Sequence, residues 1–173
     1  MEENYIQFFT ATILNWNNLL KSNKYKDIII QSMKFLVDKN KVKIYGFVIM
    51  PNHIHIIWQI ERNNKREEVQ RDFLKYTAQQ IKFDLLKNDP IYLKNFEVNL
   101  KDRRYQFWKR NPLSIDIYSR EILEQKLIYI HNNPLQEKWQ LVESVDEYSY
   151  SSASFYLSND TKYDFITNYY DCI

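Results

Sequence analysis

The sequence predicts an α+β fold in a single domain. Between residues 5 and 110, runs of β-branched and aromatic residues typical of strands alternate with segments in which apolar residues recur at helical spacing. Their order is strand, helix, strand, strand, helix, strand. Hydrophobic residues make up 45% of the 173 residues, which is enough for a substantial core. We expect one domain over residues 1–173, with a core over about 5–156 and a C-terminal tail over 157–173.

Composition and charge limit the function classes. The formal net charge of +2 is too small to indicate a generally basic surface, so any nucleic-acid contact must be local. The single cysteine, Cys172, cannot form an internal disulfide, which suits a reducing compartment. The N-terminal segment lacks the pattern of a signal peptide, and no apolar run approaches the roughly 20 residues of a membrane helix. We therefore expect a soluble cytoplasmic protein.

The first two elements are a strand and a helix. Residues Tyr5–Leu14 are rich in β-branched and aromatic side chains, which predicts a strand. Asn23 can cap a helix over Lys24–Lys39. One apolar stripe of that helix should face the core: Tyr25, Ile29, Met33 and Leu36.

A hairpin follows over residues 41–60. Residues 41–50 alternate in polarity, until Pro51 and Asn52 interrupt the pattern as expected at a turn. Residues 53–60 resume as the antiparallel partner strand. The alternation in the first strand of this hairpin predicts that one face carries Val42, Ile44, Gly46 and Val48.

His53 and His55 begin the second strand of the hairpin. Alternate side chains of a strand point to the same face, which places their Cα atoms about 6.6 Å apart. Two neutral imidazoles at that spacing can chelate one metal ion. The alternative is an ordinary sheet element with both histidines on its solvated face, so the value of the pair depends on the rest of the chain.

The next helix begins near Asn64 and Glu67, which have the spacing of a capping box, and runs to about Lys87. The Asp-Pro dipeptide at 89–90 ends it. Its core-facing stripe consists of Val69, Phe73, Thr77, Ile81 and Leu85.

Residues 101–110, KDRRYQFWKR, form a local basic patch with interleaved aromatic residues. Basic groups on phosphates and aromatic rings under bases commonly hold single-stranded nucleic acid. The alternative is an edge strand that buries Tyr105 and Phe107 and leaves the charges outside, and both interpretations can hold at once. The DNA contacts expected here are Arg103, Arg104, Tyr105, Trp108, Lys109 and Arg110.

Ser119 can cap a helix over residues 120–133 that Pro134 stops. At about 100° per residue, Tyr129 lies on the polar side of this helix. The chain has 14 tyrosines, most of which must be structural. The residues on the other side can face the core: Leu123, Leu127, Ile128 and Ile130.

Asn133 lies one turn after Tyr129 on the same helix face. Its amide oxygen can serve as a third ligand beside the two imidazoles. A residue before proline is disfavoured in helical geometry, so the direction of this side chain stays open. His131 falls about 200° from Tyr129, on the apolar side, and we expect a structural role for it.

Four motifs occur together in one order: PNHIH after an apolar strand, then FWKR, KLIYIHNNP and EYSYSSASFY. In this the sequence resembles the single-tyrosine HUH transposases, named for two histidines flanking a bulky apolar residue. Within them it resembles the REP-associated tyrosine transposases. The resemblance covers about Tyr5–Tyr156. PNHIH and YIHNNP lie about 75 residues apart, and the YSYSS segment favours this branch over compact insertion-sequence transposases.

The resemblance implies a ferredoxin-like fold, with an antiparallel sheet, helices on one face and a C-terminal helix carrying the tyrosine. It implies that His53 and His55 are the metal-binding histidines and that Asn133 completes their site. Tyr129 matches the nucleophile, and Gln125 and Lys126 beside it are expected to contact the DNA phosphate.

The implied activity is Mg²⁺- or Mn²⁺-dependent cleavage and rejoining of single-stranded or hairpin DNA through a 5′-phosphotyrosine. The resemblance favours a monomer over a homodimer and a bacterial, nucleoid-associated location. Two alternatives stay open: a domesticated regulator that binds hairpin DNA without cutting, and a relaxase or replication initiator of the HUH class. Compact length and a lone candidate nucleophile count against the second.

Overall fold

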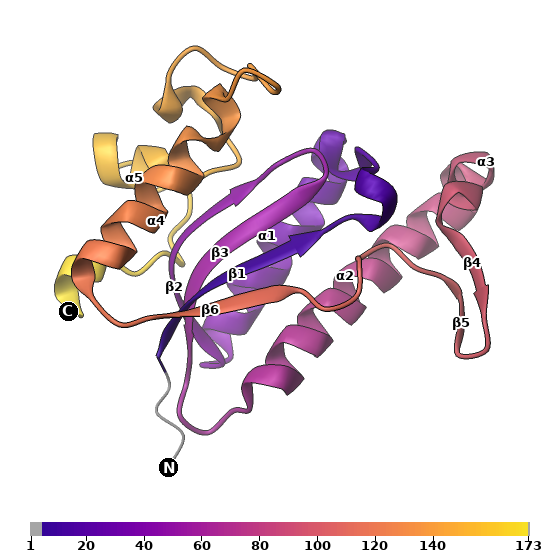
Figure 1. Cartoon of the computed structure of the whole chain (residues 1–173), viewed down its shortest axis with the longest axis horizontal. Coiled ribbons are helices and arrows are strands. Elements are labelled where there is room, and N and C mark those ends of the chain that lie inside the picture. The colour runs from indigo at the N-terminus through magenta and orange to yellow at the C-terminus, as the bar shows by residue number, and fades with distance from the viewer. Residues whose placement is uncertain (1–4, 173) are drawn as a thin grey trace.

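The computed structural model describes residues 5–172; residues 1–4 and Ile173, the two ends of the predicted domain, lie outside them. The predicted α+β fold is confirmed, with a four-stranded antiparallel sheet at its centre (Figure 1). In order across the sheet, the strands are β2 (Val42–Ile49), β3 (His53–Ile60), β1 (Ile6–Thr12) and β6 (Leu113–Ile117).

Helices cover both faces of this sheet. The long helices are α1 (Asn23–Asp38), α2 (Arg66–Asn88) and α4 (Arg120–Asn132). Helices α1 and α2 pack on one face, where Phe9, Ile56 and Trp58 belong to the larger core cluster. Helix α4 packs on the other face, where Phe8 and Ile57 meet its apolar side.

Smaller elements connect these parts. The short helices and strands are α3 (Pro90–Leu93), β4 (Glu97–Leu100), β5 (Arg103–Tyr105) and α5 (Ala153–Ser158). The 3₁₀ turns are η1 (Leu14–Trp16), η2 (Leu19–Lys21), η3 (Lys94–Phe96), η4 (Asn133–Leu135), η5 (Val145–Glu147) and η6 (Tyr169–Asp171). Within residues 5–172, no helix is both long enough and apolar enough to span a membrane.

The fourth strand of the sheet lies later in the chain than the basic patch suggested. It is β6, which pairs with β1 from Ile6↔Ile117 onward. Of residues 101–110, only 103–105 form a strand, and β5 pairs with β4 in a separate hairpin. Residues 106–108 are buried instead of alternating in and out, so this segment cannot serve as a plain edge strand.

The alternation predicted for β2 breaks at its middle. A β-bulge between Ile44 and Gly46 shifts the register against β3. As a result, Val42 and Ile44 face α1 and α2, whereas Val48 faces α4. The prediction of one shared face is therefore wrong beyond the bulge.

Gly46, the only glycine of the chain, lies where β2 and α4 approach most closely. A Cβ atom at this position would clash with Cδ2 of Leu127 and lie 3.1 Å from Oγ of Ser152. The absent side chain thus lets α4 settle against the sheet.

Of the three predicted helix caps, only the one at Ser119 is present. Ser119 caps α4, because its Oγ accepts a hydrogen bond from the backbone N of Ile122 at 3.3 Å. Asn23 is the first residue of α1, not its cap, and the residue before α2 makes no side-chain cap bond. Asn64 instead accepts from Nζ of Lys41 at 2.8 Å, so its side chain is not free to cap α2.

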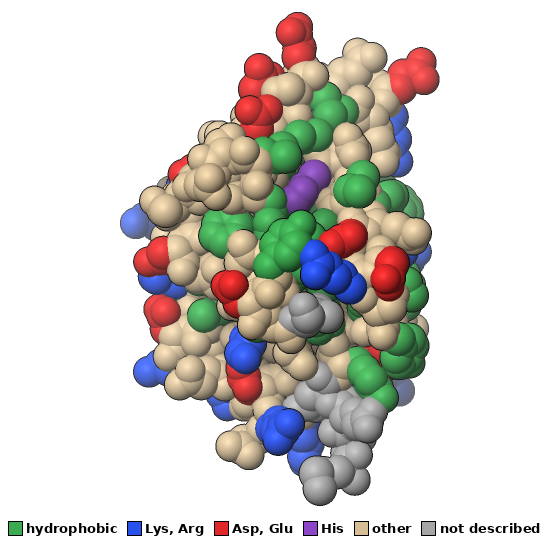
Figure 2. Space-filling view, turned by 90° about the vertical axis from the view of Figure 1, so that its left-hand side faces the viewer, with side chains coloured by type: hydrophobic (Ala, Val, Ile, Leu, Met, Phe, Trp, Pro, Cys, Tyr) green, Lys and Arg blue, Asp and Glu red, His purple; other side chains and the backbone are tan. Residues whose placement is uncertain are grey.

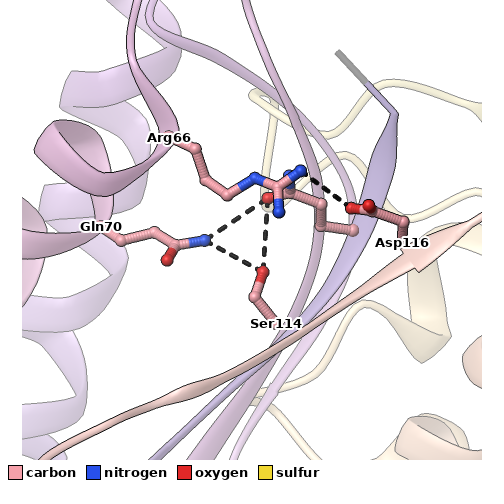
Figure 3. A network of polar contacts seen from close by, with 5 residues as sticks. Arg66, Gln70, Ser114 and Asp116 are labelled. Atoms are coloured by element: carbon pink, nitrogen blue, oxygen red, sulfur yellow. Dashed lines mark hydrogen bonds and ion pairs between the residues drawn. The ribbon is translucent and has the colours of Figure 1, made fainter. Parts of the chain in front are cut away.

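A polar network fastens β6 to the sheet and to α2 (Figure 3). Arg66 donates to Oδ1 of Asp116 at 3.0 Å, and Gln70 donates to Oγ of Ser114 at 3.1 Å. The buried amide of Gln7 on β1 lies against both Arg66 and Gln70. Because β6 precedes α4 by two residues, this network also holds the segment that leads into α4.

The chain after α4 covers the outer edge of β2. Ser152 N donates to Phe47 O at 3.0 Å, and Thr167 N donates to Ile44 O at 2.8 Å. The tail, for which the sequence predicts no role, adds three buried side chains to the larger cluster: Tyr163, Phe165 and Ile166. Covering this edge removes an exposed strand that could pair with other chains.

Candidate active site

His53 and His55 lie together on the face of the sheet that α4 covers. Their ring centroids are 4.8 Å apart with an angle of 71° between the planes. Ile57, two residues further along β3, packs in the core cluster of that face. The side chains are 8% and 6% exposed, so the alternative of a solvated face does not hold.

Tyr129 on α4 lies next to this pair. Its ring centroid is 5.5 Å from that of His55, and the residue is 47% exposed. Phe8 of β1 stacks on His55 at 5.0 Å and meets the Tyr129 ring at 6.1 Å. The tyrosine therefore borders both the buried histidines and the solvent, where a macromolecular substrate can reach it.

Asn133 completes the group from the end of α4. Its backbone keeps helical angles (φ −54°, ψ −45°) despite the proline that follows, because the chain continues into the turn η4. The residue is 2% exposed, and its side chain contacts the imidazole of His53. The structure thus brings together His53, His55, Tyr129 and Asn133.

The Nδ1 atoms of both histidines are engaged by neighbouring side chains. Nδ1 of His53 lies 2.7 Å from Oδ1 of Asn52, which can only accept, so the proton resides on Nδ1. Nδ1 of His55 lies 2.7 Å from Oγ1 of Thr10, the residue on β1 that pairs with His55 of β3. With Nδ1 engaged, a metal ion would bind through Nε2 of each ring, and metal-binding histidines are commonly oriented in this way.

Burial keeps the two imidazoles neutral. The pKa of His53 is lowered to about 4, mainly by burial and in part by the charge of Lys138, while the contact with Asn133 opposes the change. Burial lowers the pKa of His55 to about 3, with contributions from His53 and Lys126. Neutral imidazole is the form that binds a metal ion.

Two lysines lie near the histidines, each over an aromatic ring that neighbours one of the two imidazoles. Nζ of Lys126 lies 4.8 Å from the ring of Phe8, which stacks on His55. Nζ of Lys138 lies 5.8 Å from the ring of Trp139, whose centroid is 6.1 Å from that of His53. Neither lysine forms a salt bridge within the part of the chain that the structure describes.

Lys138 and Trp139 are site residues that sequence reasoning missed. The available signal was a basic-aromatic pair shortly after the YIHNNP motif, but only the turn η4 brings it back to the histidines. The indole Nε1 of Trp139 is buried and has no hydrogen-bond partner among residues 5–172.

Comparison with known proteins rests on structure. No protein-family model and no curated protein matches the chain. The solved structure of a REP-associated tyrosine transposase bound to a REP hairpin matches with a TM-score of 0.66 at 17% identity, covering 95% of this chain and 84% of that one. This chain has the fold of a REP-associated tyrosine transposase. A structure from Deinococcus radiodurans, named as a candidate transposase, matches with a TM-score of 0.47 at 12% identity, covering 76% and 94%.

Within this transposase fold, the basic patch does not form one surface. Trp108 is 7% exposed, and its Nε1 donates to Oγ1 of Thr77 at 3.0 Å. Its ring is part of the core, so the expected contact between Trp108 and DNA is wrong for this structure.

Arg103, Arg104 and Tyr105 lie on the β4–β5 hairpin, at the opposite end of the molecule from α4 (Figure 1). The two arginines also pair with Asp102 and Glu97. The structure therefore separates these three residues from Tyr129, and a DNA role for them stays a prediction.

The remaining expected DNA contacts lie at the surface. Lys109, Arg110 and Gln125 are exposed, and Lys126 is half-buried beside Phe8. On the side of α4 and α5, acidic and basic side chains are interspersed without a continuous basic face (Figure 2). A phosphate contact on this face would therefore use local groups.

His131 has a structural position, on the side of α4 away from Tyr129. Its Nε2 lies 2.8 Å from Oγ of Ser152, which also accepts a hydrogen bond from Phe47 N at 2.9 Å. No cluster of three His, Cys, Asp or Glu side chains suited to a metal occurs within residues 5–172. A metal at His53 and His55 would thus depend on Asn133 and on ligands from substrate or solvent.

Proposed function

We propose that this chain is a tyrosine transposase of the REP-associated type, which cleaves and rejoins single-stranded DNA through Tyr129. One observation carries the proposal. A half-exposed tyrosine ring lies 5.5 Å from a buried, neutral histidine pair, in a fold shared with a REP-associated tyrosine transposase.

The proposed reaction is a reversible transesterification. The hydroxyl oxygen of Tyr129 attacks the phosphorus, and the bond from phosphorus to the 3′ oxygen breaks. The products are a 5′-phosphotyrosine and a DNA strand with a free 3′-hydroxyl, which takes up a proton. Attack by a 3′-hydroxyl on the phosphotyrosine restores the diester and releases the tyrosine. One phosphoester bond replaces another, so no external energy source is needed.

The donor set fits a divalent cation. His53 and His55 offer neutral ring nitrogens, and Asn133 offers an amide oxygen on the same side. We propose that these residues hold Mg²⁺ or Mn²⁺, which when bound polarises the scissile phosphate. Lys126 and Lys138 are placed to bind phosphate oxygens.

The proposed substrate is hairpin DNA with a single-stranded flank. The structural neighbour is a transposase bound to a REP hairpin, and we extend that substrate class to this chain. His53, His55, Tyr129 and Asn133 come together within one chain, which supports a site complete in a monomer.

The test is the formation of a covalent protein–DNA adduct. The protein is incubated with hairpin oligonucleotides from the flanks of its own gene and Mn²⁺, and a denaturing gel is examined for a DNA-linked band. We expect a band that is absent in Tyr129→Phe and after chelation of the metal. A band that persists in Tyr129→Phe would assign the nucleophile elsewhere, and tight binding without any band would favour the non-cutting regulator.

A further inference from the structure

Trp16 is the most exposed of the four tryptophans, at 61%, and it plays no part in the site described above. It ends the turn η1, which follows β1 after one residue. Large aromatic side chains are usually buried because their surface is costly to hydrate. An indole ring held in solvent is therefore a feature to explain.

The backbone at this position holds the ring outward against its local preference. Asn15 and Trp16 both have φ of 55°, in the left-handed region that bulky residues rarely adopt. Neighbouring bonds fix this conformation: Ile13 N donates to Asn52 O at 2.8 Å, and Leu14 N donates to Phe107 O at 2.7 Å. Strain of this kind persists only where the surroundings enforce it, and it concentrates at functional positions.

Trp16 lies at the end of the sheet that carries the histidines. The side chain of Asn52 joins the two, because its Nδ2 donates to Trp16 O at 3.4 Å while its Oδ1 accepts from His53. In addition, Thr12 at the end of β1 pairs directly with His53. One side chain thus links the backbone of Trp16 to His53 of the candidate active site.

A cation accompanies the ring. Nζ of Lys109 lies 5.7 Å from the ring of Trp16, and its backbone N donates to Thr12 O at 2.7 Å. Lys109 is exposed and forms no salt bridge within residues 5–172, whereas Arg110 next to it pairs with Asp102. An exposed aromatic face with a free cation at its side is the combination that holds a base and its phosphate in single-stranded binding.

We propose that Trp16 and Lys109 form a stacking platform for one nucleotide of single-stranded DNA, next to the phosphate that Tyr129 attacks. Trp16 stacks on the base and Lys109 binds the phosphate. The inference rests on the proposed function for its choice of DNA as ligand. From the sequence, Trp108 of the basic segment is expected to stack on a base. In this proposal that role belongs to Trp16, which lies nearly 100 residues earlier in the chain than the buried Trp108.

The test measures binding without cleavage. Full-length Tyr129→Phe protein is titrated into a fluorescently labelled single-stranded oligonucleotide that forms no hairpin, and anisotropy gives Kd. Adding Trp16→Leu should weaken binding on the order of tenfold, whereas Trp16→Phe should retain most of the affinity. Adding Lys109→Gln should reduce the dependence of log K on log salt by about 0.7.

Phe83→Leu on α2 is the matched control, because Phe83 is 57% exposed and lies outside the site. It should bind as the parent does. Unchanged affinity in Trp16→Leu would overturn the platform, and so would an equal loss in Phe83→Leu. If the affinity depends on Trp16 but the wild-type protein forms no covalent adduct with hairpin DNA, the platform stands and the cleavage proposal is rejected, so the two failures are distinguishable.

Discussion

The candidate site depends on single side chains that differ sharply in exposure. His53 and His55 are buried and therefore neutral, whereas Tyr129 between them and the solvent is half-exposed. In the proposed mechanism, the buried pair binds a cation at neutral pH without competition from protons, and the half-exposed tyrosine meets the DNA.

His131 allows a residue-scale test of how burial acts on a histidine. Burial lowers its pKa from 6.5 to about 4, so the folded protein keeps it neutral while the unfolded chain protonates it below about pH 6.5. Its contribution to stability is present above pH 6.5 and is lost as the pH falls toward 4. At pH 5 this linkage costs about 2 kcal/mol.

The measurement is urea unfolding of wild type and His131→Gln at pH 7.5 and pH 5, since glutamine can still bond to Ser152. Wild type should lose about 2 kcal/mol more than the variant between the two pH values. The same loss in both proteins would show that His131 does not titrate as its burial implies.

At this scale the sequence predicts the motif residues but not their neighbours. His53, His55, Tyr129 and Asn133 follow from strand and helix periodicity together with the quoted motifs. The sequence does not predict which tryptophan is exposed. The exposure of Trp16 and the burial of Trp108 both depend on contacts with segments distant in the chain.

At the scale of elements, α4 is placed by contacts at both ends and in its middle. The cap at Ser119, the bond from His131 to Ser152 and the close approach at Gly46 each fix it against the sheet. Because α4 carries Tyr129, small shifts of this helix should change the site.

Gly46→Ala tests the close approach. The added methyl group would clash with Leu127, so we expect a loss of about 1–3 kcal/mol in the free energy of unfolding and weaker adduct formation. The second substitution Leu127→Ala in this background should restore part of the adduct yield by making room. Equal stability and adduct yield in wild type and Gly46→Ala would contradict the packing described here.

The polar network beneath β6 gives a second test. Arg66→Leu leaves the half-buried carboxylate of Asp116 without its guanidinium partner, and we expect a loss of about 1–2 kcal/mol in urea unfolding. Arg71→Leu is the matched control, because the pair of Arg71 and Asp72 is exposed and should contribute less than about 0.5 kcal/mol. If the two substitutions change the free energy of unfolding by similar amounts, the network does not anchor β6.

The order and type of the main elements could be predicted, because local periodicity determines them. The limits of β3 match the predicted strand, and α4 matches to within one residue. The bulge in β2 and the identity of the fourth strand could not be predicted, because both depend on pairing between distant segments.

At the scale of the molecule, the C-terminal chain covers one edge of the sheet and the candidate site lies within one chain. The tail bonds along β2, and the four site residues meet without a second copy. That the protein acts as a monomer stays a proposal.

Mixing two inactive variants tests this directly. Tyr129→Phe retains the histidines, and His55→Ala retains the tyrosine, so a mixture restores a complete site only if chains exchange α4. We expect no covalent adduct on hairpin DNA from the mixture. Recovery of the adduct would indicate sites shared between two chains.

The most direct test of the central claim is to locate the covalent bond between protein and DNA. The protein is incubated with a hairpin substrate and Mn²⁺, digested with nuclease and protease, and its peptides are examined by mass spectrometry for an attached nucleotide. We predict the nucleotide on Tyr129 and on none of the other 13 tyrosines. Attachment to a different tyrosine, or no attachment on a substrate that the protein binds and cuts, would contradict the mechanism.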